Sequence, residues 1–437
     1  MSVAPARRAA FTVVRRVFEQ GAFADRALHS AAADLDQRDR ALAMRLAYGT
    51  VQRKRTLDYL LTAFVSRPLD RLEPAVLAAL RLGMFQILYL GGVTDYAAVN
   101  ESVELAKQES RGGAQLVNAV LRRAGREGQQ LLAKLDDTTP QRAAVLHSVP
   151  DWLAEMWWSE LGPEAARVLL SSVNEPAESA IRVNQLKATP EQVEAALRTA
   201  SPPAASHAAP EWSDQPALPE LPEMLVLEGA FDAFASELFK QGALMPQARA
   251  SAAVARALAP QAGERVLDLC AAPGGKTTHL AALMAAEGEL VAVEVHPGRA
   301  RALAETCEQM GADNARVVQV DAREFRDTQP FDRVLVDPPC SGLGTLQARP
   351  DLRWQPRRGE IAELAAKQGE LLRAGAAQLK PGGSLVYSVC TISREEAEGV
   401  VDAFVAEHGD FVCEHRWQLL PSSDGTDGFF IARLRRG

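Results

Sequence analysis

The sequence is poor in cysteine, and the five that it has argue against two common kinds of site. Their number is odd, none stands in a C-x-x-C pair, and all lie in the C-terminal half of the chain. This pattern disfavours a disulfide framework and a structural zinc site. We therefore expect free thiols in a reducing compartment and no bound metal.

A signal-peptide pattern and long apolar runs are also missing. Residues 1–20 carry four arginines among apolar residues, without a continuous apolar core or a small-residue cleavage site. The most apolar stretch, residues 75–93, contains Arg81 and Gln86, so it predicts a buried helix rather than a membrane span. We expect a cytoplasmic monomer that does not associate with membranes.

Charge is distributed unevenly along the 437 residues. The net charge is −8, but residues 1–145 hold 21 Lys and Arg against 15 Asp and Glu and are positive by 6, while the remainder is negative by 14. An asymmetry of this sign suggests that the front part meets a polyanion. Ordinary surface variation is the alternative explanation.

The spacing of apolar residues and of helix breakers predicts three regions. Residues 1–145 predict an all-helical bundle, because apolar side chains recur at helical spacing and glycine and proline gather at a few breaks. Residues 146–247 predict a connecting α+β subdomain, with a proline-rich loop at 201–223 that forms no regular element. Its strands are expected at 180–184 and 224–228, and residues 248–437 form the third region.

From residue 264 onward, short apolar strands alternate with helices. This alternation predicts an α/β fold with a Rossmann-like, mostly parallel, doubly wound sheet. Ligands of such sheets bind at the carboxyl ends of the strands. Strands are expected at 265–269, 289–293, 315–320, 333–336 and 384–388, and helices at 276–286, 298–310, 359–379 and 394–407, the last opened by a Ser393–Glu396 capping box.

The run Val266-Leu-Asp-Leu-Cys-Ala-Ala-Pro-Gly-Gly-Lys-Thr277 reads as a strand, a glycine-rich turn and a helix. Gly274 and Gly275 allow the backbone to turn sharply and to approach a ligand closely. The helix N-terminus offers free N–H groups to a carboxylate or phosphate. A nucleotide P-loop is the alternative, but it requires glycine where Cys270 stands, and Pro273 removes a backbone donor.

Two acidic residues follow this loop at successive strand ends. Glu294 lies about twenty residues beyond the turn, where dinucleotide-binding folds place an acceptor for ribose hydroxyls. Asp321 ends the next strand and is positioned to reach an adenine amino group. Each alone reads as a solvated carboxylate, but together and in this order they favour a nucleoside cofactor.

Two cysteines stand at the ends of the remaining strands, in Asp337-Pro-Pro-Cys340 and in Ser388-Val-Cys390-Thr391. Thiols at neighbouring strand ends suggest a shared reaction. A thiolate added to C6 of cytosine makes C5 nucleophilic toward a methyl sulfonium, and a second group can assist release. Asp337, if protonated or hydrogen-bonded to N3, would stabilise the negative charge that builds up in the ring. Small buried thiols are the alternative, and we accept it for Cys307, Cys413 and the side chain of Cys270.

At these residues the sequence resembles the Sun-type family of RNA 5-methylcytosine methyltransferases, over most of residues 150–437. The resemblance implies S-adenosylmethionine as cofactor, Cys390 as the nucleophile at C6, Cys340 as the residue that assists release, and Asp337 as a contact of the cytosine. It places Lys276 and Arg182 on the RNA path. The cofactor pocket would be lined by Cys270, Ala271, Ala272, Pro273, Gly274, Gly275, Lys276, Glu294, Asp321 and Asp337. The family commonly has Asp after Gln247, where this chain has Ala248.

Four runs of the N-terminal part look like the NusB-type antitermination fold: residues 47–53, 82–88, 97–103 and 117–122. This resemblance implies that residues 1–145 bind RNA and that residues 248–437 are the methyltransferase domain. The combination is similar to bacterial methyltransferases of small-subunit (16S) ribosomal RNA, which implies that substrate. Generic helix-bundle core segments are the plainer interpretation of each run.

Three alternatives remain at this point. The first is an enzyme of the same kind that acts on tRNA or another RNA. The second is an amino-group methyltransferase, although that class has an aromatic residue after Asp-Pro-Pro, where Cys340 stands. The third is an inactive RNA-binding assembly factor, against which the intact pair of cysteines argues.

Overall fold

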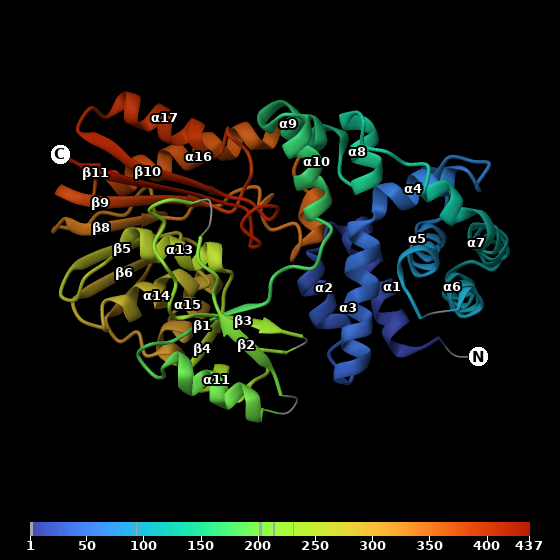
Figure 1. The fold of residues 1–437 in the computed structure, drawn as a ribbon, viewed down its shortest axis with the longest axis horizontal. Helices are drawn as coiled ribbons and strands as arrows, with labels where there is room; N and C mark the ends of the chain where they lie inside the picture. The colour runs from blue at the N-terminus through green and yellow to red at the C-terminus, as the bar shows by residue number, and fades with distance from the viewer. Residues whose placement is uncertain (1–2, 93, 201–202, 213–214, 230) are drawn as a thin grey trace. The chain divides into compact units, whose positions relative to one another are not determined.

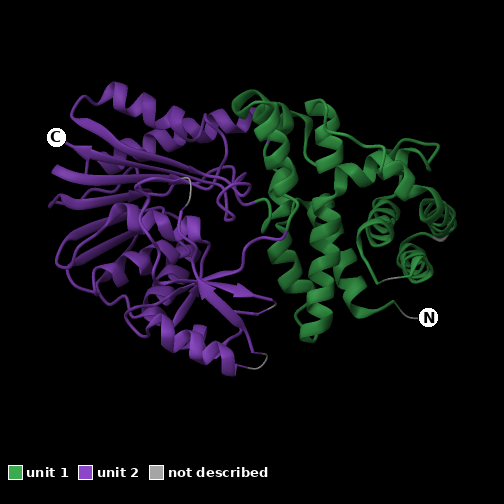
Figure 2. Cartoon of the chain, in the orientation of Figure 1, with its two compact units in different colours: residues 1–175, 346–356 green, residues 176–345, 357–437 purple. Residues whose placement is uncertain are grey.

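The structure is a computed structural model that describes residues 3–92, 94–200, 203–212, 215–229 and 231–437. The chain divides into two compact units, shown in Figure 2. Unit 1 comprises residues 1–175 and 346–356, and unit 2 comprises residues 176–345 and 357–437. The chain therefore leaves unit 2 after Thr345 and returns to it at Arg357.

Unit 1 consists of helices around an apolar core, which confirms the all-helical prediction. Proline stands at the first position of the first helix, and the side chains of Asp36, Thr94 and Thr139 accept backbone N–H groups at three other helix starts. The helices are α1 (Pro5–Gln20), α2 (Ala24–Ala31), α3 (Gln37–Gln52), α4 (Lys54–Thr62), α5 (Pro74–Tyr89), α6 (Asp95–Glu109), α7 (Arg111–Leu132), α8 (Pro140–His147), α9 (Asp151–Leu161) and α10 (Pro163–Ser172), with the short η1 (Leu69–Arg71). Helices α5, α6 and α7 pack side by side (Figure 1).

Residues 346–356 belong to unit 1 although the chain on both sides of them belongs to unit 2. The segment contains the short helix η2 (Pro350–Trp354). Arg353 is fully buried, and its guanidinium donates to the carbonyls of Ser148 and Val173, both at 3.1 Å, and to Asn174 Oδ1 at 3.0 Å. Nothing in the local sequence pattern predicts this excursion, because its partners lie far away in the chain.

The first sheet of unit 2 is small and antiparallel, in the order β2-β3-β1-β4. Its strands are β1 (Ala180–Val183), β2 (Ala205–Ala208), β3 (Met224–Glu228) and β4 (Leu244–Pro246), accompanied by α11 (Pro190–Thr199) and α12 (Glu237–Lys240). The prediction that residues 201–223 form no regular element is wrong at β2. Pro203 and Pro210 flank this edge strand and leave its backbone free to pair with β3, while residues 201–202 and 213–214 lie outside the described residues.

In the described part of the chain, the second sheet of unit 2 has seven strands in the order β10-β11-β9-β8-β5-β6-β7. Pairing is parallel from β9 to β7, which confirms the doubly wound prediction. No strand is predicted beyond residue 388, yet β10 and β11 add an antiparallel edge. The strands are β5 (Arg265–Leu269), β6 (Glu289–Glu294), β7 (Ala315–Gln319), β8 (Phe331–Val336), β9 (Leu379–Val389), β10 (Phe411–Leu419) and β11 (Phe429–Arg436).

Helices cover both faces of this large sheet (Figure 1). One face carries α13 (Arg249–Leu258), α14 (Gly275–Leu283) and α15 (Pro297–Met310), and the other carries α16 (Arg358–Ala376) and α17 (Glu398–Glu407). Apolar strand residues are buried on each side. Among the described residues, no helix combines the length and the apolar character that crossing a membrane requires.

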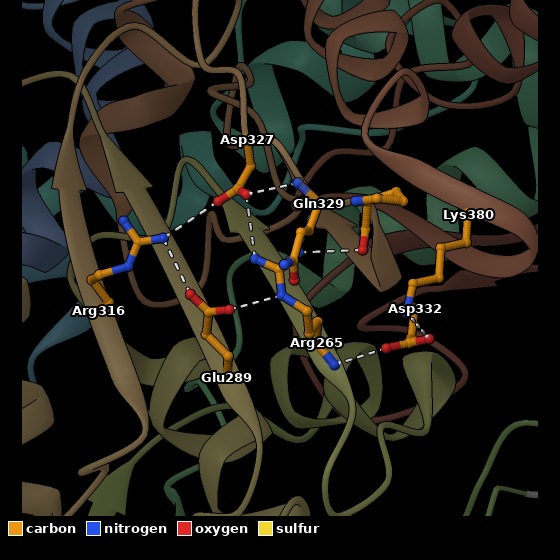
Figure 3. A network of polar contacts seen from close by, with 8 residues as sticks. Arg265, Glu289, Arg316, Asp327, Gln329, Asp332 and Lys380 are labelled. Carbon is orange, nitrogen blue, oxygen red and sulfur yellow. Dashed lines mark hydrogen bonds and ion pairs between the residues drawn. The ribbon is translucent and has the colours of Figure 1, made fainter.

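Charged side chains join the strands at the amino edge of the large sheet (Figure 3). Arg265 Nε donates to Glu289 Oε2 at 2.7 Å, and the Arg265 backbone N–H donates to Asp332 Oδ2 at 2.8 Å. Lys380 pairs with Asp332 at 2.7 Å, and Arg316 pairs with Glu289. This network occupies the edge opposite the motifs, which stand at the carboxyl edge.

Candidate active site

The predicted site residues gather along the carboxyl edge of the large sheet. Across the order β9-β8-β5-β6-β7, Cys390 directly follows β9 and Asp337 directly follows β8. The glycine-rich loop follows β5, Glu294 ends β6, and Asp321 lies two residues beyond β7. The sheet order therefore places the glycine-rich loop between the two thiols on one side and the two acidic residues on the other.

The two thiols face each other. Cys340 Sγ and Cys390 Sγ are 3.2 Å apart, and both residues are partly exposed. The other three cysteines take no part in this contact. Cys307 is buried as expected, and burial raises the pKa of Cys270 to about 12, but Cys413 is partly exposed on β10 rather than buried. The structure thus pairs only the two cysteines that the motifs single out.

A salt bridge lies next to the thiols. Lys276 Nζ is 2.8 Å from Asp337 Oδ2, and Ser388 Oγ donates to Asp337 Oδ1 at 2.8 Å. Burial lowers the pKa of Lys276, but the charges of Asp337, Cys390 and Asp268 outweigh burial and raise it. Lys276 therefore stays an ammonium group in the site, held by Asp337.

The glycine-rich loop is held in a shape that suits a ligand. Gly274 has φ +110°, in the left-handed region, and forms the N-cap of α14. Arg299 Nη2 donates to the Ala272 carbonyl at 2.9 Å. Behind the loop, Thr277 Oγ1 donates to Asp268 Oδ2, while the buried Asp268 Oδ1 has no hydrogen-bond partner among the described residues. Burial raises the pKa of Asp268 to about 7.

These residues fit S-adenosylmethionine. The cofactor has an ammonium group, a ribose diol and an adenine amino group, all of which are donors that require acceptors. Glu294, only 3% exposed at the end of β6, and Asp321 supply carboxylates in the order that a nucleoside requires. Asp268 Oδ1 is a buried acceptor without a partner in the described part of the chain, which a bound donor would satisfy.

Arg182 is not at the surface, where a contact with RNA would require it. It is fully buried on β1, and its guanidinium donates to Gln247 Oε1 at 2.8 Å and to Thr278 Oγ1 at 2.9 Å. Burial lowers its pKa to about 10. This placement favours support of the helix that follows the glycine-rich loop over a contact with RNA.

One important residue, Glu396, escapes the sequence analysis. The capping box predicted for Ser393 and Glu396 is wrong, because α17 begins only at Glu398 and the Glu396 carboxylate turns inward. It accepts hydrogen bonds from Ser341 and Thr391, the residues that follow the two cysteines. The only signal in the sequence for a role at the site was that Glu396 stands six residues after Cys390. A capping box at a helix start accounted for the same residues.

Comparisons with known proteins give a consistent result. A family model described as 16S rRNA methyltransferase RsmB/F matches residues 255–435, one described as NusB family matches residues 4–126, and one described as Methyltr_RsmF/B-like, ferredoxin-like domain matches residues 149–212. The chain is 36% identical over 424 residues to the probable ribosomal RNA small subunit methyltransferase B of Bacillus subtilis, with 92% of each chain covered. It is 34% identical over 455 residues to the protein of the same name from Synechocystis, with 99% of each covered.

Solved structures also match. The crystal structure of PH0851 is 27% identical with a TM-score of 0.82 and covers 100% of both chains. The crystal structure of NSun6 from Pyrococcus horikoshii with SFG is 25% identical with a TM-score of 0.57, covering 67% of this chain and 99% of that one.

Proposed function

The chain belongs to the RsmB/F family of 16S rRNA methyltransferases, and on that premise we propose that Cys390 is the nucleophile with which it methylates C5 of cytosine. It is an S-adenosylmethionine-dependent RNA (cytosine-C5)-methyltransferase that acts on 16S ribosomal RNA. The observation that carries the thiol mechanism is the 3.2 Å separation of Cys340 and Cys390 at the carboxyl edge of the sheet.

The reaction requires a covalent step because C5 of cytosine is a weak nucleophile. The Cys390 thiolate adds to C6 and forms an S–C6 bond, and the C5–C6 π electrons become available at C5. C5 uses these electrons to bond the methyl group that S-adenosylmethionine would supply when bound, and the sulfonium–methyl bond breaks to leave a neutral thioether. C5 then loses its proton to solvent water, the electron pair of the C5–H bond restores the C5–C6 double bond, and the electron pair of the S–C6 bond leaves with the Cys390 sulfur as a thiolate.

The two thiols have different charges around them. The Lys276 ammonium and the Cys390 sulfur act on each other, and this contributes to the raised pKa of Lys276. Cys340 instead faces the carboxylate of Glu396 and the sulfur of Cys390, and its pKa is raised well above the ordinary value, with the Cys390 hydrogen bond as the largest cause. The anion beside Cys340 keeps it a thiol, whereas Cys390 has the Lys276 cation beside it, which suits a nucleophilic sulfur.

Release of the product is assigned to Cys340. Its sulfur lies within hydrogen-bond reach of the Cys390 sulfur and carries a proton, because its pKa is raised. When the S–C6 bond breaks, a proton donor at this distance stabilises the departing thiolate. Asp337, held by Lys276 and Ser388, stands at the end of β8 where it can accept a hydrogen bond from the cytosine.

The cofactor is assigned to the residues between the thiols and the end of β7. The Cys270–Lys276 loop approaches it through Gly274, Glu294 accepts from the ribose, and Asp321 accepts from the adenine. Asp268 supplies the buried acceptor beneath the loop.

RNA binding is assigned in part to the helical unit, whose cleft between α6 and α7 has a volume of about 370 Å³. Tyr96, 65% exposed, lines it together with Arg122 and Arg126. Neither arginine forms an ion pair among the described residues, whereas the cleft beside Tyr59 has Arg55 and Arg142 paired with Asp151 and Asp136. Arginines outside any described ion pair, beside an exposed ring, suit the phosphate and base of a single strand, although Asp95 also lines the cleft.

The covalent adduct provides the direct test. The full chain, incubated with a 16S rRNA fragment and S-adenosylmethionine, should form a protein–RNA complex that survives denaturation when Cys340 is replaced by Ala. It should form none when Cys390 is replaced. Mass spectrometry of the product nucleosides that placed the methyl group on an exocyclic amine would contradict the proposal.

A further inference from the structure

Glu396 links the two loops that carry the thiols. Its side chain is fully buried, and both carboxylate oxygens are engaged. Oε1 accepts from the Ser341 backbone N–H at 2.9 Å, and Oε2 accepts from Ser341 Oγ at 2.5 Å and from Thr391 Oγ1 at 3.1 Å. Ser341 Oγ and Thr391 Oγ1 are themselves 2.8 Å apart. One carboxylate thus binds the residue after Cys340 and the residue after Cys390.

The Glu396 carboxylate is fixed from the helix and the strand behind it. Gln368 on α16 donates through Nε2 to Glu396 Oε1 and to the Pro339 carbonyl, both at 3.0 Å. Tyr387 on β9 donates to the Glu396 carbonyl oxygen at 2.6 Å. The residues on both sides of Cys340, Pro339 and Ser341, are therefore held by one buried network that has Glu396 at its centre.

We propose that Glu396 is a positioning residue of the methyl-transfer reaction, which holds the Cys340 loop against the Cys390 turn and so sets the separation of the two thiols. The inference rests on the proposed roles of Cys340 and Cys390. The carboxylate binds the residues that follow the two cysteines rather than the sulfur atoms, so it acts through the backbone beside them. A buried carboxylate is costly to desolvate unless donors satisfy it, and four donors do so here.

The charge of Glu396 has a second effect in the same place. The groups that face Cys340 are Cys390, Glu396, Tyr387 and the backbone of Gly342. The Cys390 hydrogen bond, burial, and the charges of Cys390 and Glu396 all raise the pKa of Cys340, and the Gly342 backbone lowers it. Glu396 therefore both places Cys340 and helps to keep it protonated beside the Cys390 thiolate.

Two variants of the full chain separate these effects. Glu396→Gln removes the charge, and Thr391→Val removes one tie while leaving the charge. Both should slow breakdown of the covalent adduct, and with it turnover, by about a hundredfold, because the thiol that assists release is then misplaced, with S-adenosylmethionine binding unchanged by calorimetry. Only Glu396→Gln should shift the pH profile of Cys340 alkylation, read by peptide mass spectrometry, toward lower pH. Glu395→Gln, an exposed carboxylate in the same turn, is the matched control and should behave as wild type.

Adduct breakdown at the wild-type rate in a folded Glu396→Gln protein would overturn the proposal. If that variant does not fold, the Ser341→Ala, Thr391→Val double variant carries the test, and a normal rate in it overturns the proposal equally. If the pH profile of Cys340 alkylation is the same in Glu396→Gln as in wild type, the charge of Glu396 does not raise the pKa of Cys340, and that part of the proposal is wrong. Failure of the proposed function looks different, because the wild-type chain itself would then form no adduct through Cys390.

Discussion

The sulfur atoms of Cys340 and Cys390 lie 3.2 Å apart, although 50 positions separate them in the chain. Parallel pairing of β8 with β9 produces this contact, because the loops that follow the two strands leave the sheet at the same edge. The two thiols are in contact but have different proposed roles. Replacing each of them should therefore affect a different step of the reaction.

Replacing the thiols one at a time should divide the reaction into its steps. Cys390→Ala should abolish methyl transfer and adduct formation, because no S–C6 bond can form. Cys340→Ala should retain adduct formation and block release, so that the RNA stays attached to the protein on a denaturing gel. Cys413→Ser, on β10, is the control and should turn over normally. Normal turnover of Cys390→Ala would refute the mechanism.

The stability of the protein should depend on His279 in weakly acidic solution. Burial, and then the charge of Arg182, lower the pKa of this fully buried imidazole from 6.5 to about 4. The unfolded chain therefore binds a proton more readily between these values, and the stability from this group decreases as the pH falls from about 6.5 to 4. The decrease is on the order of 3 kcal/mol.

Burial raises the pKa of Asp268 to about 7, so this group stabilises the protein as the pH falls and opposes the effect of His279. Comparing wild type with a His279 variant isolates the contribution of the imidazole, because Asp268 is present in both proteins. The free energy of unfolding of wild type and of His279→Asn should be measured between about pH 5 and 7, where the unfolded-state imidazole titrates. Glu223, the partner of His279, stays ionised in this window because its pKa is about 2. The wild type should lose stability more steeply toward the acidic end, and equal slopes would show that His279 does not titrate as described.

The cleft between α6 and α7 should contribute to RNA affinity. Arg122→Glu and Arg126→Glu should each weaken binding of a 16S rRNA fragment, because a phosphate is then no longer neutralised. Each such phosphate should reduce the dependence of log Kd on log salt by roughly 0.7–0.9. Tyr96→Ala should weaken binding by about 1–3 kcal/mol if a base stacks on the ring. Fluorescence anisotropy at several salt concentrations measures both effects.

Tyr59→Ala is the matched control for this cleft. Its ring is 53% exposed in the same unit, but the arginines around it are paired with carboxylates. It should bind RNA as wild type does. Equal decreases in affinity for Tyr59→Ala and Tyr96→Ala would mean that exposed rings of the unit contribute without a specific cleft.

Arg353 should stabilise unit 1 far more than its neighbour Arg349. Arg353→Met leaves the buried carbonyls of Ser148 and Val173 without this donor, at a cost on the order of 3 kcal/mol. Arg349→Met, at an exposed position of the same segment, should change stability by less than about 0.5 kcal/mol. Hydrogen exchange of residues 141–175 measures the local destabilisation, and unchanged protection in Arg353→Met would contradict it.

The sequence alone was sufficient for most of the elements and for the residue types at their ends. Apolar runs with β-branched residues predict β5, β6, β7 and β8 within a few positions, and helical spacing predicts unit 1, because both patterns are local. Strands β10 and β11 were missed: β10 is a half-exposed edge strand with little apolar periodicity, whereas β11 is largely buried between β10 and β9, and its apolar run at residues 429–432 is a strand signal that was overlooked. Strand β2 was also missed, because the prolines on both sides of it predict an irregular segment although the strand itself contains no proline.

The sequence itself determined which chemical groups are present and at which strand ends they stand: two thiols, a lysine and three acidic residues around a glycine-rich turn. Only the tertiary structure decided which of them meet. It set Cys340 against Cys390, turned Glu396 from an expected helix cap into the tie between their loops, and buried Arg182 behind the glycine-rich loop. The physical reason is that these contacts depend on sheet order and on side chains distant in the chain, whereas hydrophobic periodicity and capping patterns report only on neighbours within a few residues.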